Sequence, residues 1–323
     1  MGIQAAILGA SGYTGGEVFR YLAGHPSIGV QAVAAGSTAG RPLAELHPGV
    51  AAVAGDLVLQ PLEDVVGRSV DVLFSCLPSG RLKEHDAKLK ADLVIDLADD
   101  HRADTEWVYG LTEFCRGDLQ GASRIANPGC YPTAVLLGLV PFVRAGVVSD
   151  PVVVDAMSGV SGAGRGLDDR LLFTNIEGGA AAYGAVPHRH VVEMERYAER
   201  FGGAEVHLSF TPHLIPVTRG LVATIRAKLV HPITNEEAME ILNGAYAGEY
   251  FVHPRSEWPG TKAVAGSNHV HVSARVDDRN GWLIASSAID NLGKGAAGQA
   301  IQNANVALGL DETSGLQVLG VSP

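Results

Sequence analysis

The chain has 323 residues, which suits two domains better than one, because single hydrophobic cores stop growing at roughly 250–300 residues. With 46% hydrophobic and 18% charged residues, it can bury a large core with little disorder. The formal charge of −11 argues against non-specific binding to nucleic acid or to membranes. No apolar run approaches the length of a membrane span and no basic segment precedes the apolar start, so we expect a cytoplasmic protein.

In the first part of the chain, short apolar runs alternate with helical patterns, which predicts βαβ units and a parallel sheet. Strands are expected over Ile3–Leu8, Val30–Ala35, Val70–Leu77, Leu93–Leu97 and Ser123–Ala126. Helices are expected over about Glu17–Leu22 and, rich in charge, over Arg81–Leu89.

From about Pro132 a long helix is expected to run through Val143, since proline is tolerated in the first turn of a helix. The pattern then changes to longer strands, which predicts an α+β part with a mostly antiparallel sheet. These strands are Val152–Met157, Glu205–Pro212, Leu221–Val230, His269–Val276 and Trp282–Ala288, with only two helices among them, near Val191–Phe201 and Asn235–Tyr246. A last alanine-rich helix, about Gly295–Leu308, can return to the first domain.

A glycine-rich turn follows the first expected strand and opens the first expected helix. Glycines let the backbone turn sharply and approach a pyrophosphate, which then meets free N–H groups at the helix N-terminus. The alternative is a tight turn that binds nothing, but the position between strand and helix favours a dinucleotide. The predicted cofactor contacts here are Gly9, Ser11, Gly12, Tyr13, Thr14 and Gly15.

The end of the second strand indicates which dinucleotide is used. NAD-preferring sites usually place a carboxylate there to bind the ribose hydroxyls. This chain has Ser37, Thr38 and Arg41 instead, which suit a 2′-phosphate and predict NADP(H). For Arg41 alone, an ordinary polar loop explains the residue at least as well.

Cys130 is the candidate nucleophile, within Asn127-Pro128-Gly129-Cys130-Tyr131-Pro132-Thr133. It lies between a short strand and a helix, where the positive end of the helix dipole favours the reactive thiolate. Nearby backbone N–H groups can stabilise an oxyanion. The other two cysteines, Cys76 and Cys115, are interpreted as inert, and three widely spaced cysteines give neither a disulfide framework nor a zinc motif.

His188 and His190 lie just ahead of an expected helix and are the candidates for acid/base catalysis. We favour His188, because it follows Pro187 and lies outside the helix, and assign His190 a capping or structural role. No third ligand supports a metal site. His213 is interpreted as structural.

A substrate phosphate or carboxylate needs hydroxyls, backbone donors and a guanidinium. The segment Ser158-Gly159-Val160-Ser161-Gly162-Ala163-Gly164-Arg165 supplies all three after a strand. The predicted substrate-binding residues are Ser158, Ser161, Arg165, Arg102 and Asn127.

At this point the chain resembles the N-acetyl-γ-glutamyl-phosphate reductase family over essentially its full length. The matching segments are Gly9–Gly15, Asn127–Thr133, Ser158–Arg165, His188–His190, Thr261–Asn268 and Ala288–Gln299. The first and last are also similar to aspartate-semialdehyde dehydrogenases. One departure is Asp96-Leu97-Ala98-Asp99-Asp100-His101-Arg102, where the family commonly has DLSADFR, followed by a shortened loop.

The resemblance implies an α/β protein of the semialdehyde dehydrogenase type. A Rossmann-type NADP-binding domain would span residues 1–131 plus 300–323, and an α+β catalytic and dimerisation domain residues 132–299. It implies NADPH as cofactor with Asn291 near it, Cys130 as nucleophile, and a histidine of the His188–His190 group as acid/base. The substrate would be a small acyl phosphate, reduced through a thioester in arginine biosynthesis by a homo-oligomer, a dimer or a tetramer.

Two other functions remain open on the sequence. The chain can be a reductase of another acyl phosphate, either aspartyl phosphate or a carrier-linked aminoadipyl or glutamyl phosphate. It can also be a non-catalytic NADP-binding regulator, although such a protein has no need for Cys130 together with the two histidines.

Overall fold

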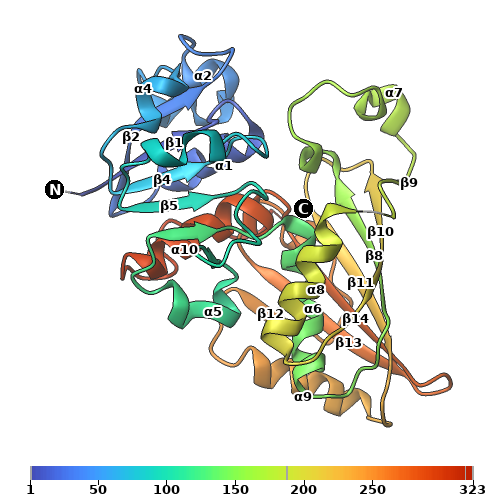
Figure 1. Cartoon of the computed structure of the whole chain (residues 1–323). Coiled ribbons are helices and arrows are strands. Elements are labelled where there is room, and N and C mark those ends of the chain that lie inside the picture. Colours follow the sequence, from blue (N-terminus) through green and yellow to red (C-terminus); the bar gives the residue numbers. More distant parts are fainter. Residues whose placement is uncertain (1, 187, 317, 322–323) are drawn as a thin grey trace. The chain divides into compact units, whose positions relative to one another are not determined.

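The computed structural model describes residues 2–186, 188–316 and 318–321, so Pro187 lies outside the described residues. The chain forms two compact units (Figure 1). The first comprises Met1–Gly129 with Ala296–Val318, and the second Cys130–Gly295 with Leu319–Pro323. The units therefore divide the chain at 129/130 and 295/296, where the predicted domains divide it at 131/132 and 299/300.

A parallel sheet forms the first unit, with seven described strands in the order β3-β2-β1-β4-β5-β7-β6. They are β1 (Ile3–Leu8), β2 (Ile28–Ala35), β3 (Gln60–Pro61), β4 (Val72–Ser75), β5 (Leu93–Asp96), β6 (Val108–Tyr109) and β7 (Arg124–Ala126). Their apolar runs are mostly buried, as strands covered on both faces require. The five predicted strands are confirmed, and the two-residue β3 and β6 are too short to leave a pattern in the sequence.

The helices of the first unit differ more from expectation. They are α1 (Tyr13–Leu22), α2 (Leu43–Leu46), α3 (Ala51–Ala54), α4 (Leu62–Val66), α5 (Thr112–Leu119) and α10 (Gly298–Ala307), with 3₁₀ turns at Pro48–Val50 and Lys83–Lys88. The charged helix predicted over Arg81–Leu89 is wrong, since only the 3₁₀ turn forms there. None of the residues in that turn is buried, and short helices without an apolar face to pack are unstable in water.

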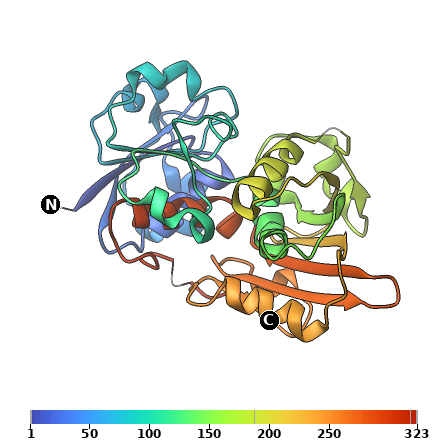
Figure 2. The same cartoon turned by 60° about the horizontal axis from the view of Figure 1, so that its bottom comes forward.

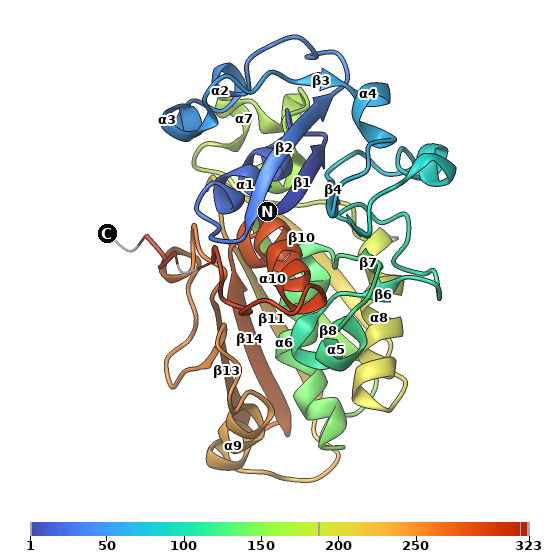
Figure 3. The same cartoon turned by 90° about the vertical axis from the view of Figure 1, so that its left-hand side faces the viewer.

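Helix α10 returns to the first unit, as predicted, and contacts α1, α5 and β5 (Figure 3). Buried amides fix it there. The Asn303 side chain donates to the carbonyl of Gly110 at 2.8 Å and to Asn127 Oδ1 at 3.0 Å, and accepts from Thr112 Oγ1 at 2.8 Å. Because these groups are all buried, the network ties α10 to the end of the parallel sheet.

The second unit contains a mixed sheet in the order β12-β13-β14-β11-β8-β10-β9, and the predicted mostly antiparallel pairing is confirmed. Its strands are β8 (Val152–Gly159), β9 (Ala181–Ala182), β10 (Leu208–Ile215), β11 (Leu221–Lys228), β12 (Val252–Pro254), β13 (Val270–Asp277) and β14 (Trp282–Ile289). Along β8 and β11 buried residues alternate with part-exposed ones, so one sheet face is packed and the other open.

Helices cover the packed face. They are α6 (Cys130–Arg144), α8 (Arg189–Gly202) and α9 (Asn235–Ala245), with α6 and α8 side by side (Figures 1 and 2). The three long helices predicted here are confirmed. The structure adds the four-residue α7 (Phe173–Ile176) and 3₁₀ turns at Val160–Ala163, Asp169–Leu171 and Thr261–Ala263, so the expectation of only two helices among the strands is wrong. A π turn, Gly293–Ala297, precedes α10.

Among the described residues, no helix combines the length and apolar character needed to cross a bilayer.

Replacing Asn303 tests the network that holds α10. Asn303→Ala leaves the Gly110 carbonyl and the Asn127 amide oxygen without this donor in a buried site, so we expect a loss of about 3 kcal/mol in the free energy of unfolding. Urea denaturation measures it. The matched control is Asn280→Ala, whose side chain is exposed and bonds only at the surface, and a similar loss there would contradict the assignment.

Candidate active site

The glycine-rich turn of the first unit is built for a close backbone approach. Gly9 has φ +76°, and a Cβ on it would lie 2.5 Å from the carbonyl oxygen of Cys76. A Cβ on Gly15 would lie 2.5 Å from the Gly9 oxygen. Helix α1 then starts with Gly12 at its N-cap, where no side chain caps the backbone N–H groups. The turn follows β1, beside β4, the reversal point of strand order at which such sheets bind nucleotides.

The end of β2 also fits an NADP ribose phosphate. The Thr38 hydroxyl is buried and has no hydrogen-bond partner in the described part of the chain. Ser37 is exposed. Arg41 is about half exposed and pairs with Glu45 at 3.1 Å, a weak surface pair that a phosphate can replace. Hydroxyls and a guanidinium can bind a 2′-phosphate, and the described residues 36–41 include no carboxylate.

In the second unit, Cys130 is the first residue of α6, which starts two residues before the Pro132 that the sequence indicates. Its side chain is half-buried. The backbone of Gly295 packs against it, since a Cβ on Gly295 would lie 2.9 Å from Cys130 Cβ. A thiol at this end of a helix lies at the positive end of the helix dipole, which favours a thiolate.

The other two thiols have different surroundings. Burial, together with the charge of Asp96, raises the pKa of Cys76. Cys115 is 5% exposed, and its Sγ lies 3.0 Å from the carbonyl oxygen of Tyr109. Neither environment favours a thiolate.

Aromatic side chains gather around the histidines. The Tyr131 ring makes edge contacts with His188 and His190, both at 6.0 Å between centroids, and with Phe210 at 5.2 Å. The Tyr131 hydroxyl lies 2.9 Å from that of Tyr183. Burial raises the pKa of both phenols, and the charge of Cys130 adds to it, so the thiol shares this environment.

His188, not His190, caps helix α8, which corrects the sequence interpretation. The Nδ1 atom of His188 accepts from the backbone N–H of His190 at 3.1 Å. A backbone N–H can only donate, so Nδ1 carries no proton and neutral His188 has its proton on Nε2. Burial and the charge of Arg189 lower the pKa of His188 and keep the ring neutral. His190 is the more buried of the two, 6% exposed.

Ser158 and Ser161 are buried, and internal partners use their hydroxyls. Ser158 Oγ donates to the Gly159 carbonyl at 3.2 Å and also bonds to Tyr131. Ser161 Oγ accepts from Asn291 Nδ2 at 2.8 Å, while Asn291 Oδ1 accepts from the N–H of Gly220. Arg165 follows them in an exposed stretch.

Arg102 and Asn127 belong to the first unit and have structural contacts there. Arg102 is 8% exposed and donates to the carbonyls of Asn127 at 2.9 Å and Leu97 at 3.1 Å. Asn127 is fully buried; its amide donates to the Ala296 carbonyl at 3.1 Å. The structure thus gathers Cys130, His188, His190, Ser158, Ser161 and Asn291 in one unit, and the glycine turn, Ser37, Arg41, Arg102 and Asn127 in the other.

Three residues near these sites escape the sequence reasoning. Tyr131 could have been found from the sequence, because it directly follows Cys130. Tyr183 could not, because it lies in a segment without helical or strand periodicity. His101 is 1% exposed, stacks on Trp107 at 3.9 Å and bonds to Asp96 through Nδ1 at 2.8 Å. It holds the segment that carries Arg102, and only its departure from the family pattern marks it.

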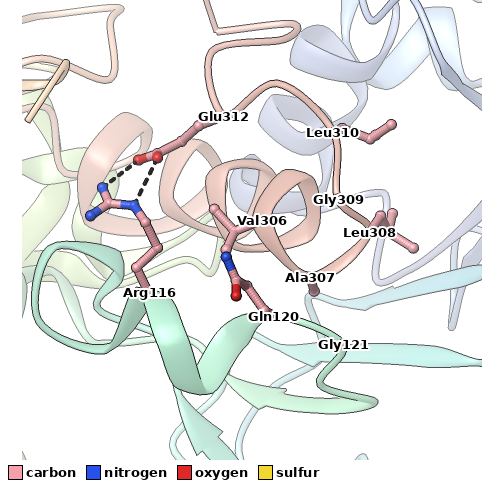
Figure 4. A pocket seen from close by; sticks show the side chains of 9 residues that line it. All are labelled: Arg116, Gln120, Gly121, Val306, Ala307, Leu308, Gly309, Leu310 and Glu312. Carbon is pink, nitrogen blue, oxygen red and sulfur yellow. Dashed lines mark hydrogen bonds and ion pairs between the residues drawn. The ribbon is translucent and has the colours of Figure 1, made fainter.

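A hollow of about 600 Å³ in the first unit lies between the end of α5 and the end of α10 (Figure 4). Its charged side chains, Arg116 and Glu312, pair with each other at 3.0 Å. None of the predicted site residues lines it. In the described ranges, no group of three or more histidine, cysteine or acidic side chains could hold a metal ion.

The thiols should differ in reactivity. With iodoacetamide at pH 7–8 we expect Cys130 to be alkylated first, because the raised pKa of Cys76 keeps that thiol protonated and Cys115 is buried. Peptide mass spectrometry of the alkylated protein measures the order. Faster labelling of Cys76 or Cys115 than of Cys130 would contradict the assignment of the nucleophile.

Known proteins resemble the chain along its whole length. Residues 4–122 match the NAD-binding domain of semialdehyde dehydrogenases, and residues 130–291 match their dimerisation domain. Proteins named N-acetyl-gamma-glutamyl-phosphate reductase are 40% identical in Moorella thermoacetica, over 99% of this chain and 100% of the relative, and 41% identical in a Bradyrhizobium species, over 100% of both.

Solved structures share the fold at lower identity. The aspartate semialdehyde dehydrogenase II of Vibrio cholerae, complexed with ASA, has a TM-score of 0.75 at 19% identity, over 95% of this chain and 98% of that one. The Candida albicans aspartate semialdehyde dehydrogenase with NADP has a TM-score of 0.70 at 18% identity over the same shares. Sequence and fold agree: the chain belongs to the N-acetyl-γ-glutamyl-phosphate reductase family of the semialdehyde dehydrogenases.

Proposed function

We propose that the protein reduces N-acetyl-L-glutamyl 5-phosphate to N-acetyl-L-glutamate 5-semialdehyde and phosphate, with NADPH, in arginine biosynthesis. The observation that carries the proposal is Cys130 at the first residue of α6, in one environment with His188 and two neutral phenols. The names of relatives about 40% identical over the full length support the substrate.

Cys130 is the nucleophile in this proposal. Its thiolate attacks the carbonyl carbon of the acyl phosphate, the C–O bond to phosphate breaks, and a thioester remains on the sulfur. NADPH, when bound, supplies the hydride that reduces this thioester. Hydride addition leaves a tetrahedral alkoxide on the sulfur. Its C–S bond then breaks as the oxygen forms the aldehyde carbonyl, and the electron pair returns to Cys130 as the thiolate.

His188 serves as a hydrogen-bond donor to the substrate oxygen. Because its cap leaves the proton on Nε2, the neutral ring can stabilise the oxyanion that forms at each step but has no lone pair at Nε2 to take a proton from a thiol. The thiolate is instead favoured by the N-terminus of α6. His190, buried beside Tyr131, forms a wall of the site.

We assign the NADP-binding domain to residues 1–131 plus 300–323 and the catalytic and dimerisation domain to residues 132–299, with Cys130 at the junction of the two segments. The pyrophosphate would be held by the glycine-rich turn, that is by Gly9, Ser11, Gly12, Tyr13, Thr14 and Gly15. The 2′-phosphate would be bound by Ser37, Thr38 and Arg41. Ser158, Ser161, Arg165, Arg102 and Asn127 would surround the substrate, Arg165 as the exposed cation, and Asn291 would fix Ser161 beside the cofactor.

We propose that the protein is a homo-oligomer, a dimer or a tetramer, joined through the open face of the second sheet. The name of the matched dimerisation domain supports this, as does Met157, which is 45% exposed within a strand. We place the protein in the cytoplasm, where its proposed substrate and cofactor are dissolved metabolites, and expect no nucleic-acid partner.

Turnover of purified protein tests the function. We expect reduction of N-acetyl-L-glutamyl 5-phosphate, faster than that of aspartyl phosphate and with NADPH preferred over NADH. Cys130→Ser should abolish it while NADPH still binds, because a hydroxyl is a far weaker nucleophile. Near-normal turnover in this variant would exclude the thioester, and a preference for aspartyl phosphate would exclude the substrate.

Two replacements of His188 separate the role of its Nδ1 atom, which caps α8, from the role of its Nε2–H group, which would donate a hydrogen bond to the substrate. Asparagine keeps an acceptor near the place of Nδ1 and loses the donor, so His188→Asn should lower kcat by roughly 100- to 1,000-fold with little loss of stability. Glutamine places an N–H donor near Nε2, so His188→Gln should stay within about tenfold of the unchanged protein. Steady-state kinetics and thermal unfolding measure both, and equal inactivation of the two variants would indicate a general base.

A further inference from the structure

The segment between Gly164 and Val186 is a long connection with little packing of its own (Figure 1). Leu167 is fully exposed and Phe173 is 77% exposed. Its regular pairing is the short contact of β9 with β10, continued by the Tyr183 N–H, which donates to the Pro212 carbonyl at 3.0 Å. Tyr183, by contrast, is half-buried and points inward.

The Tyr183 hydroxyl meets that of Tyr131, at 2.9 Å. Tyr131 is 2% exposed and also bonds to Ser158, whose own hydroxyl donates to the Gly159 carbonyl. The two phenol oxygens share one hydrogen bond, in which either hydroxyl can be the donor. This bond joins the exposed connection to a buried residue at the start of α6.

Both tyrosine rings border His188. Its centroid lies 6.0 Å from that of Tyr131 and 6.3 Å from that of Tyr183, with edge geometry in both pairs. Phe210 adds a third edge contact at 5.1 Å. The ring that caps α8 is therefore surrounded by aromatic groups, one of which comes from the exposed connection.

The backbone at Val186 is strained. Val186 has φ 41°, the left-handed region that β-branched residues avoid, and its side chain is 92% exposed, so packing does not hold it there. Such a conformation persists only where the ends of the segment are fixed. One end is the Tyr183 hydroxyl bond, and the other is the His188 cap on α8.

We propose that Tyr183 is a positioning residue, which holds the His188 ring in place through its hydroxyl bond to Tyr131 and thereby sets the donor that the reaction uses. Its role in turnover rests on the proposed function, but the contact itself does not. Loss of the hydroxyl should loosen the residues that lead into α8 and reduce kcat through His188 alone.

Hydrogen exchange of the full-length protein tests the contact without turnover. In Tyr183→Phe the ring volume is kept and one hydrogen bond is lost, so the amides of His190 and Val191 should exchange about 5- to 10-fold faster, the equivalent of one net hydrogen bond. The matched control is Tyr246→Phe, which removes another buried hydroxyl bonded to α6, at the Leu137 carbonyl. It should leave these amides unchanged. Unchanged exchange in Tyr183→Phe would overturn the proposal.

A double-mutant cycle tests the action through His188. Tyr183→Phe should lower kcat about 5- to 10-fold with KM little changed, and should have no further effect in a His188→Ala background. Additive losses would show that Tyr183 acts independently and would overturn the proposal. If the unchanged protein does not turn over the acyl phosphate, the proposed function fails. The hydrogen-exchange result still shows whether the Tyr183–Tyr131 contact holds the start of α8.

Discussion

The burial of α6 is the constraint on which the second unit depends. Every residue from Tyr131 to Val143 is buried, because the helix packs between the sheet and its neighbours α8 and α9. A helix so enclosed cannot shift along its axis without opening cavities. Its first residue, Cys130, therefore has a fixed place, and the half-burial of the thiol follows from its position at the helix end. Packing along the whole helix thus decides where the Cys130 thiol lies.

The sequence predicts the fold well where a pattern extends over several turns or a whole strand. Ile3–Leu8 is predicted with its actual bounds, and α6, α8 and α9 are predicted within a few residues, because each has an apolar face or run to bury. The failures are short or polar segments. Arg81–Leu89 has helical charges but no apolar stripe, and β9 is formed by two exposed alanines, so tertiary contacts decide both.

The sequence predicts which residues belong to the candidate site better than it predicts which of them contact one another. The context of Cys130 between strand and helix is local, and so is the glycine turn. The capping of α8 is different. Whether His188 or His190 accepts the free N–H depends on where the helix begins, and helix ends are the least certain part of a sequence pattern. Tyr183 is harder still, because its partner Tyr131 lies 52 residues away.

A buried carboxylate fixes the turn that packs against the Cys130 thiol. Asp290 is fully buried, accepts from Arg219 at 2.9 and 3.1 Å, and accepts from the N–H groups of Leu292 and Gly293 at 2.8 and 2.9 Å. A buried charge is tolerable only with such partners, so the carboxylate fixes the turn that contains them. Its backbone carbonyl accepts from the N–H of Gly295, the residue that packs against Cys130.

The same turn explains why two glycines stand there. A Cβ on Gly293 would lie 2.2 Å from the Ser267 carbonyl oxygen, and one on Gly295 would press on Cys130. The turn is a π turn, a form that occurs often at functional sites because the wider ring lets the backbone bulge. Here the bulge brings the backbone of Gly295 into contact with Cys130. The bonds of Asp290 hold the turn in this position, and the lack of side chains on Gly293 and Gly295 leaves room for the contact.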